Sequence, residues 1–135
     1  MSTRIPRLFA ALDLTSAGLL GLGVFVGLPD RWLYVDLPAG LLIALFALTA
    51  VGLFASTAWA EKVARATAIV ALAFGLLLIA LLALGASYLY GIYGPVGQGG
   101  ALIYVLIIAL AIPYLVALPV AQFLWFSRAG TAARP

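Results

Sequence analysis

Four long runs of apolar residues constrain this chain more than any other feature of its sequence. They cover residues 8–28, 37–59, 67–88 and 101–126. A helical crossing of a bilayer takes about 20 apolar residues, so each run is long enough to cross once. Only 8% of the 135 residues are charged, whereas a soluble domain is typically about one-quarter charged. The sequence therefore predicts a single all-α domain, a compact bundle of four transmembrane helices.

The first run could alternatively be a secretory signal peptide. Asp13 interrupts the apolar core that such a peptide needs, and no convincing cleavage site follows it. We therefore interpret residues 8–28 as the first transmembrane span.

Basic residues are distributed unevenly between the segments that separate the runs. One side carries Arg4, Arg7, Lys62, Arg65, Arg128 and Arg134, and the other side carries only Arg31. The positive-inside rule therefore predicts that both termini are cytoplasmic, with residues 127–135 as a short, disordered tail. The Ala-, Leu- and Arg-rich composition favours the inner membrane of a bacterium.

The sequence contains no cysteine and no histidine. The usual ligands of zinc and of iron–sulfur clusters, and the commonest general base, are therefore missing. The serines have no evident base to activate them. We expect no enzyme activity, no cofactor and no metal site from this chain alone. The basic residues form no single patch, so we expect no nucleic-acid partner.

Asp13 defines one face of the first predicted helix. At about 100° per residue, small residues share its side of the helix, whereas Leu14, Leu19 and Leu22 lie opposite. Small residues four positions apart allow membrane helices to approach closely. We therefore expect the Asp13 face to pack inward. The predicted packing residues are Ala17, Gly21, Gly23 and Gly27 on this helix, with Gly75 on the third.

Asp13, Ser16 and Gln122 are the candidate binding residues. Acidic residues inside a membrane are costly and often mark ion, proton or substrate sites. The alternative is structural, with Asp13 bonded to Ser16, to a neighbouring helix or to another subunit. Gln122 lies near the inner end of the fourth run, where an amide more often bonds between helices than to a ligand. Both interpretations of Asp13 stay open.

An acid early in the first of four spans is similar to the arrangement in small four-span multidrug exporters. Those proteins use glutamate, are shorter and carry aromatic motifs that this sequence lacks. The resemblance is one of architecture and implies no family membership.

Residues 91–100 contain five glycines and are predicted to form an outer loop. The segment lacks the lysine and hydroxyl residue of a nucleotide-binding glycine loop. We expect a tight connector whose backbone can approach a partner protein. Its candidate contact residues are Tyr93, Gly94, Pro95, Gly97 and Gly99.

Two further local predictions concern helix ends and kinks. Asp36 resembles the N-cap of the second helix, with Pro38 in its first turn. Pro113 and Pro119 each lack a backbone donor, so they should kink or open the fourth helix.

Two functional hypotheses follow. The first is a small non-catalytic membrane subunit or assembly partner of a larger membrane complex, surrounded by lipid and contacting other subunits or copies of itself. The second is a small homo-oligomeric transporter or channel that uses Asp13 as a proton- or cation-linked site. Lipid or quinone binding at the kinked fourth helix is a further alternative.

Overall fold

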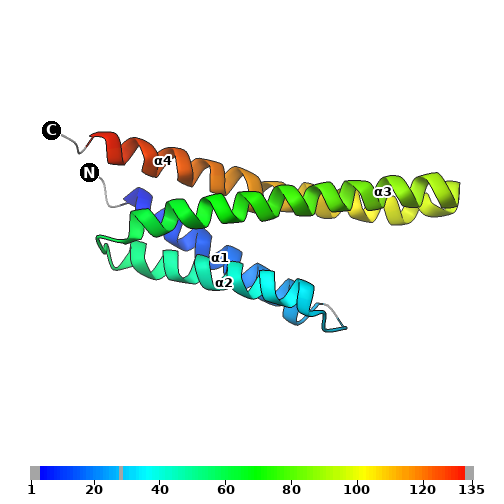
Figure 1. Cartoon of the computed structure of the whole chain (residues 1–135), viewed down its shortest axis with the longest axis horizontal. Helices are drawn as coiled ribbons and strands as arrows, with labels where there is room; N and C mark the ends of the chain where they lie inside the picture. Colours follow the sequence, from blue (N-terminus) through cyan, green and yellow to red (C-terminus); the bar gives the residue numbers. More distant parts are fainter. Residues whose placement is uncertain (1–3, 28, 133–135) are drawn as a thin grey trace. The chain divides into compact units, whose positions relative to one another are not determined.

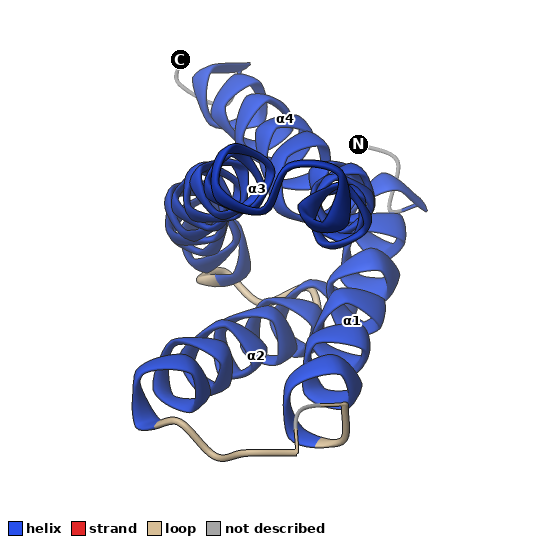
Figure 2. Cartoon of the chain, turned by 90° about the vertical axis from the view of Figure 1, so that its right-hand side faces the viewer, coloured by secondary structure: helices blue, strands red, loops and turns tan. Residues whose placement is uncertain are grey.

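The computed structural model describes residues 4–27 and 29–132, and these residues form helices and connecting turns without a strand (Figure 2). The elements are α1 (Arg4–Phe25), α2 (Leu33–Phe54), α3 (Ala60–Ile112), the π-helical segment η1 (Pro113–Ala117) and α4 (Leu118–Ala132). Among the described residues, three stretches are long and apolar enough to cross a membrane, namely Arg4–Phe25, Leu33–Phe54 and Ala60–Arg128. The protein is therefore all-helical, with helices suited to a membrane.

The chain divides into two compact units. Unit 1 comprises Met1–Thr67 and Gln122–Pro135, of which the structure describes 4–27, 29–67 and 122–132, and unit 2 comprises Ala68–Ala121. Unit 1 therefore joins residues from both ends of the sequence. Unit 2 is one continuous middle segment.

Unit 2 is a helical hairpin that turns at Gly94. The α3 ribbon reverses direction and returns alongside itself (Figure 1). Gly94 has φ 51° and ψ −129°, a non-helical conformation inside α3 that favours glycine. The arms approach at matched distances from the turn, since Gly85 faces Tyr104 and Gly75 faces Leu115. The two arms are therefore antiparallel.

The predicted loop at residues 91–100 is wrong in its extent. The structure is helical on both sides of Gly94, so the turn is confined to one position in the glycine-rich segment. Glycine weakens a helix but does not prevent it. In lipid, a single segment can satisfy its backbone donors and acceptors internally only by forming a helix. The connector is therefore far tighter than its composition indicated.

The predicted opening of the chain at Pro113 is confirmed, because residues 113–117 form a π-helical turn. The N–H of Leu118 donates to the carbonyl oxygen of Pro113, five residues back instead of four. Pro119 has no N–H to offer the carbonyl of Leu115. A Cβ atom added at Gly75 would lie 2.5 Å from that carbonyl oxygen. Gly75 therefore permits a close backbone approach in unit 2.

Unit 1 contains α1 and α2, which pack against each other as an antiparallel pair (Figure 2). The prediction that Asp36 caps α2 is wrong, because the helix begins at Leu33 and Trp32 is its N-cap. Asp36 instead lies in the first turn, where its negative charge interacts favourably with the positive end of the helix dipole. Arg31 is its ion-pair partner, at 3.8 Å.

Other boundaries differ from the predictions. The second helix ends at Phe54 rather than at residue 59, before a turn in which Ser56 has a φ of 53°. Residues 127–132, predicted to be a disordered tail, continue α4 to Ala132. The remaining tail residues, 133–135, lie outside the described part of the chain, and Arg134 is one of them.

Candidate functional site

Asp13 on α1 and Gln122 on α4 form a buried polar pair in unit 1. The Nε2 atom of Gln122 donates a hydrogen bond to each carboxyl oxygen of Asp13, and both distances are 2.7 Å. Neither residue has any exposed surface. The pair therefore joins the first helix to the last through two hydrogen bonds shielded from water.

An aromatic pair lies one helical turn away from this polar pair. Phe9 precedes Asp13 by four residues on α1, and Phe126 follows Gln122 by four on α4. The two rings pack with centroids 5.7 Å apart, tilted by 51°. The matched spacing shows that α1 and α4 run antiparallel here. The rings lie on the side of the polar pair nearer the two chain ends, and both are buried.

The helical phase of α1 agrees with this arrangement. Asp13, Ser16 and Ala17 are buried, whereas Leu14 and Leu22 are 56% and 62% exposed. Ser16 does not bond to Asp13, because its hydroxyl donates to the Leu12 carbonyl of its own helix at 2.9 Å. Of the candidate binding residues, the structure therefore brings Asp13 and Gln122 together and directs the Ser16 hydroxyl elsewhere.

Thr49 on α2 and Thr67 on α3 form a second buried polar pair, which the sequence analysis did not identify. Their hydroxyl oxygens are 2.8 Å apart, and neither side chain is exposed. A Cβ atom at Gly21 would lie 3.8 Å from Ile43 on α2. Continuing that antiparallel register by two turns brings Thr49 to about the level of Asp13. Each of the four α-helices thus contributes a fully buried polar residue to unit 1.

The predicted packing glycines fall into two groups. Gly75 lies against the backbone of Leu115, and Gly21 is in ordinary contact range of Ile43. A Cβ atom at Gly23 would meet nothing within 4 Å, and at Gly27 the nearest atoms belong to Gly23. An added side chain at Gly23 therefore faces open space, whereas one at Gly27, beyond the end of α1, would first meet the backbone of Gly23.

The candidate partner-contact residues lie at the tip of the unit 2 hairpin. Tyr93, Pro95 and Gly99 are exposed, whereas Gly97 is buried against the backbone of Leu89 on the opposite arm. Gly94 supplies the turn itself. The segment therefore combines an exposed tip with a close crossing of its own arms.

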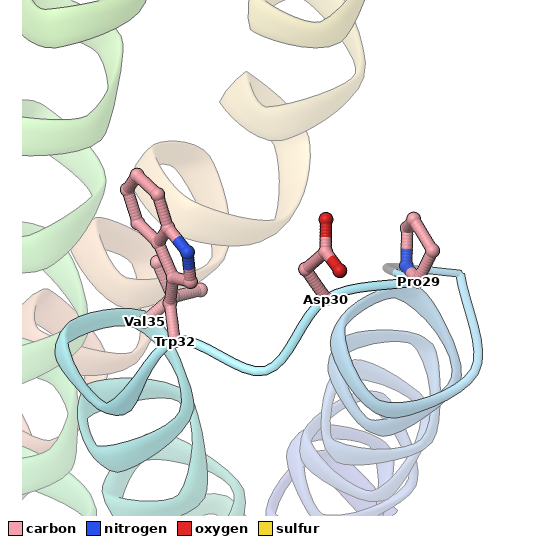
Figure 3. A pocket seen from close by; sticks show the side chains of 4 residues that line it. All are labelled: Pro29, Asp30, Trp32 and Val35. Atoms are coloured by element: carbon pink, nitrogen blue, oxygen red, sulfur yellow. The ribbon is translucent and has the colours of Figure 1, made fainter.

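A surface pocket lies at the connector that leads from α1 into α2, lined by Pro29, Asp30, Trp32 and Val35 (Figure 3). Next to it, the Arg31 guanidinium donates to the carbonyl oxygen of Phe25 at 2.5 Å and lies 5.1 Å from the centroid of that ring. Arg31 thereby satisfies a carbonyl at the end of α1, where a positive charge is favourable. These contacts give the connector a structural role.

No protein-family model matches the chain, and no curated protein or solved structure is significantly similar to it.

Proposed function

We propose that this chain is a small non-catalytic subunit or assembly partner of a larger membrane protein complex. In this proposal it crosses the inner membrane of a bacterium four times, with both ends in the cytoplasm. Its surroundings are lipid, and its partners are other membrane subunits or further copies of the chain.

The turn at Gly94 supports four crossings. It divides the 69-residue apolar stretch Ala60–Arg128 into two antiparallel arms. Each arm exceeds the length of about 20 residues that one crossing requires. Together with α1 and α2, the two arms account for four crossings, and the Lys and Arg count supports cytoplasmic termini.

The exposed surface of the hairpin is the observation that carries the proposal. Between residues 76 and 114, Gly97 is the only buried residue. Apolar side chains cover both arms, as Leu84 and Leu110 are 67% and 71% exposed. In unit 1, by contrast, Asp13 is buried and bonded to Gln122, and Thr49 is buried and bonded to Thr67. Such a hairpin offers most of its surface to lipid or to other proteins.

Site-specific photocrosslinking in native membranes, combined with purification in mild detergent, tests the proposal. A crosslinker at position 84 should capture a defined membrane protein that also co-purifies with the chain. The matched control is position 118 in the same unit, where the native leucine side chain is buried, and it should capture nothing. A chain that purifies alone and crosslinks only to lipid would contradict the proposal.

A second candidate is a homo-oligomeric transporter or channel that uses Asp13 as a proton- or cation-linked site. It is supported by the Oε1 atom of Gln122, which is buried beside the acid without a hydrogen-bond partner. Four helices are few for enclosing a pathway, so this function requires several copies. Flux into vesicles should disappear in Asp13→Asn and persist in the control Asp30→Asn, which changes an exposed acid. Flux that survives Asp13→Asn would exclude this mechanism.

A further inference from the structure

The hydrogen bonds between Asp13 and Gln122 use only one of the two polar atoms of the Gln122 amide. The amide of Gln122 has a donor atom, Nε2, and an acceptor atom, Oε1. Nε2 donates to both oxygens of Asp13, whereas Oε1 is buried with no donor. Buried acceptors in native proteins are nearly always satisfied. The missing donor therefore needs a chemical explanation.

The neighbouring buried hydroxyls do not supply it. Ser16 donates to the carbonyl oxygen of Leu12. Thr49 and Thr67 bond to each other through one of their two hydroxyl hydrogens, and neither hydroxyl is a partner of Oε1. No donor to Oε1 exists among the residues that the structure describes. The one group already beside the amide that can gain a donor is the carboxyl group of Asp13.

We propose that Asp13 and Gln122 form a proton-binding site, in which the neutral acid donates its O–H to Gln122 Oε1 while Nε2 donates to the other carboxyl oxygen. The two oxygens of a carboxyl group match the oxygen and nitrogen of an amide in spacing, so both bonds form face to face. To form this ring, the amide rotates from the observed arrangement, in which Nε2 faces both carboxyl oxygens, until Oε1 faces one of them. Every donor and acceptor facing the partner residue is then used.

The surroundings of Asp13 favour the neutral acid. A charged carboxylate inside a membrane is costly unless it is paired with opposite charge. Charged side chains on the elements of unit 1 lie toward the helix ends: Arg4 and Arg7 on α1, Asp36 on α2, Glu61, Lys62 and Arg65 on α3, and Arg128 on α4. Within the described residues, the structure gives Asp13 a neutral amide as its partner. The rings of Phe9 and Phe126 separate this pair from the chain ends.

The proton balance of the site is simple. On release, the proton passes from an Asp13 oxygen to water, and the carboxylate keeps the two bonds from Nε2 that the structure shows. On uptake, the proton adds to one carboxyl oxygen and is shared with Oε1. A metal cation fits less well, because calcium, for example, takes six to eight oxygen ligands, and the described residues hold no cluster of three or more acidic side chains that could bind a metal. The pair can bind a proton in this way whether the chain is a subunit of a complex or a transporter.

Infrared spectroscopy of the purified, reconstituted full chain tests the site. At pH 7, the wild type should show the carbonyl band of a protonated carboxylic acid, and Asp13→Asn should lose it. Gln122→Leu should shift the band, because the hydrogen bond to Oε1 is lost. The control Asp30→Asn should leave the band unchanged. Raising the pH should abolish the band reversibly in the folded protein.

Two outcomes would overturn the inference. One is a wild-type spectrum at pH 7 without any acid band that Asp13→Asn removes. The other is a band that disappears when sodium is added at constant pH, which would indicate a cation site. Should Asp13→Asn fail to fold, ¹³C-aspartate labelling of the wild type provides the same measurement, since the acid band must then shift with the isotope.

Discussion

Asp13 and Gln122 are 109 residues apart in the sequence and share two hydrogen bonds of 2.7 Å. They connect the first helix to the last, and the packing of Phe9 against Phe126 continues that connection by one turn. Unit 1 is thereby closed by contacts between its most distant segments. The stability of this closure can be measured.

Replacing one partner of this pair should cost more than replacing both. Asp13→Leu or Gln122→Leu leaves a buried polar group unpaired, so each should lower the free energy of unfolding by about 1–3 kcal/mol. The double variant should lose less than either single variant, because it leaves no polar group of the pair buried without its partner. Asp13→Asn should stay close to wild type, because two amides can also pair. Unfolding in mixed micelles provides the measurement, and strictly additive losses would show that the two side chains are not coupled.

The Thr49–Thr67 pair should behave in the same way on the other side of unit 1. Either threonine changed to valine strands the opposite hydroxyl in an apolar interior, at a cost of about 1–3 kcal/mol. Changing both removes donor and acceptor together and should be nearly neutral. Thermal unfolding of the single and double variants distinguishes a bonded pair from two independent hydroxyls, for which the double variant would be the least stable.

Gly94→Ala should destabilise the hairpin of unit 2. Its φ of 51° and ψ of −129° are strained for a residue with a Cβ atom, so the loss should be roughly 1–3 kcal/mol. Gly99→Ala is the matched control, because this helical glycine has nothing within 4 Å of an added Cβ. That change should stabilise the hairpin by about 0.5–1 kcal/mol. Equal effects at the two positions would argue against a turn confined to Gly94.

Gly75→Leu should be more disruptive than Gly23→Leu. A side chain at Gly75 collides with the backbone of Leu115, whereas Gly23 faces open space. Overpacking of this kind typically costs about 1–3 kcal/mol. The measurement is the yield of folded, monodisperse protein after extraction. A Gly23→Leu variant that unfolds as readily as Gly75→Leu would show that the end of α1 packs within the chain after all.

Single cysteines introduced into this cysteine-free chain test the proposed topology. An impermeant thiol reagent added from outside intact cells should label position 98 and spare position 62. Lys62 and Gln98 are both exposed, so burial does not limit either reaction. Labelling of position 62, or protection of position 98, would contradict cytoplasmic termini with four crossings.

Helical periodicity was enough to predict which face of α1 is buried, but not which other helix packs against that face. Counting at 100° per residue separated Asp13 from Leu14 and Leu22, and burial in the structure follows that division. Asp13 and Gln122 were each singled out as polar residues in apolar runs. Their contact was not predictable, because sequence spacing within one helix says nothing about which other helix lies beside it.

The glycine positions alone did not predict where the chain turns or where helices pack closely. Five glycines in residues 91–100 predicted a loop, yet only Gly94 leaves the helix. Glycine permits unusual backbone angles without requiring them, so composition cannot say which glycine will use them. Similarly, Gly23 and Gly75 belong to the same small-residue pattern. Only the structure shows that Gly75 has a neighbour.

The distance in sequence between Asp13 and Gln122 also sets a delay during synthesis. At about 5–20 residues per second, the ribosome needs roughly 5–20 s to proceed from one to the other. For that interval Asp13 on the nascent α1 has no amide partner. The buried acid of α1 therefore gains its two hydrogen bonds only after the Gln122 segment of α4 has been synthesised.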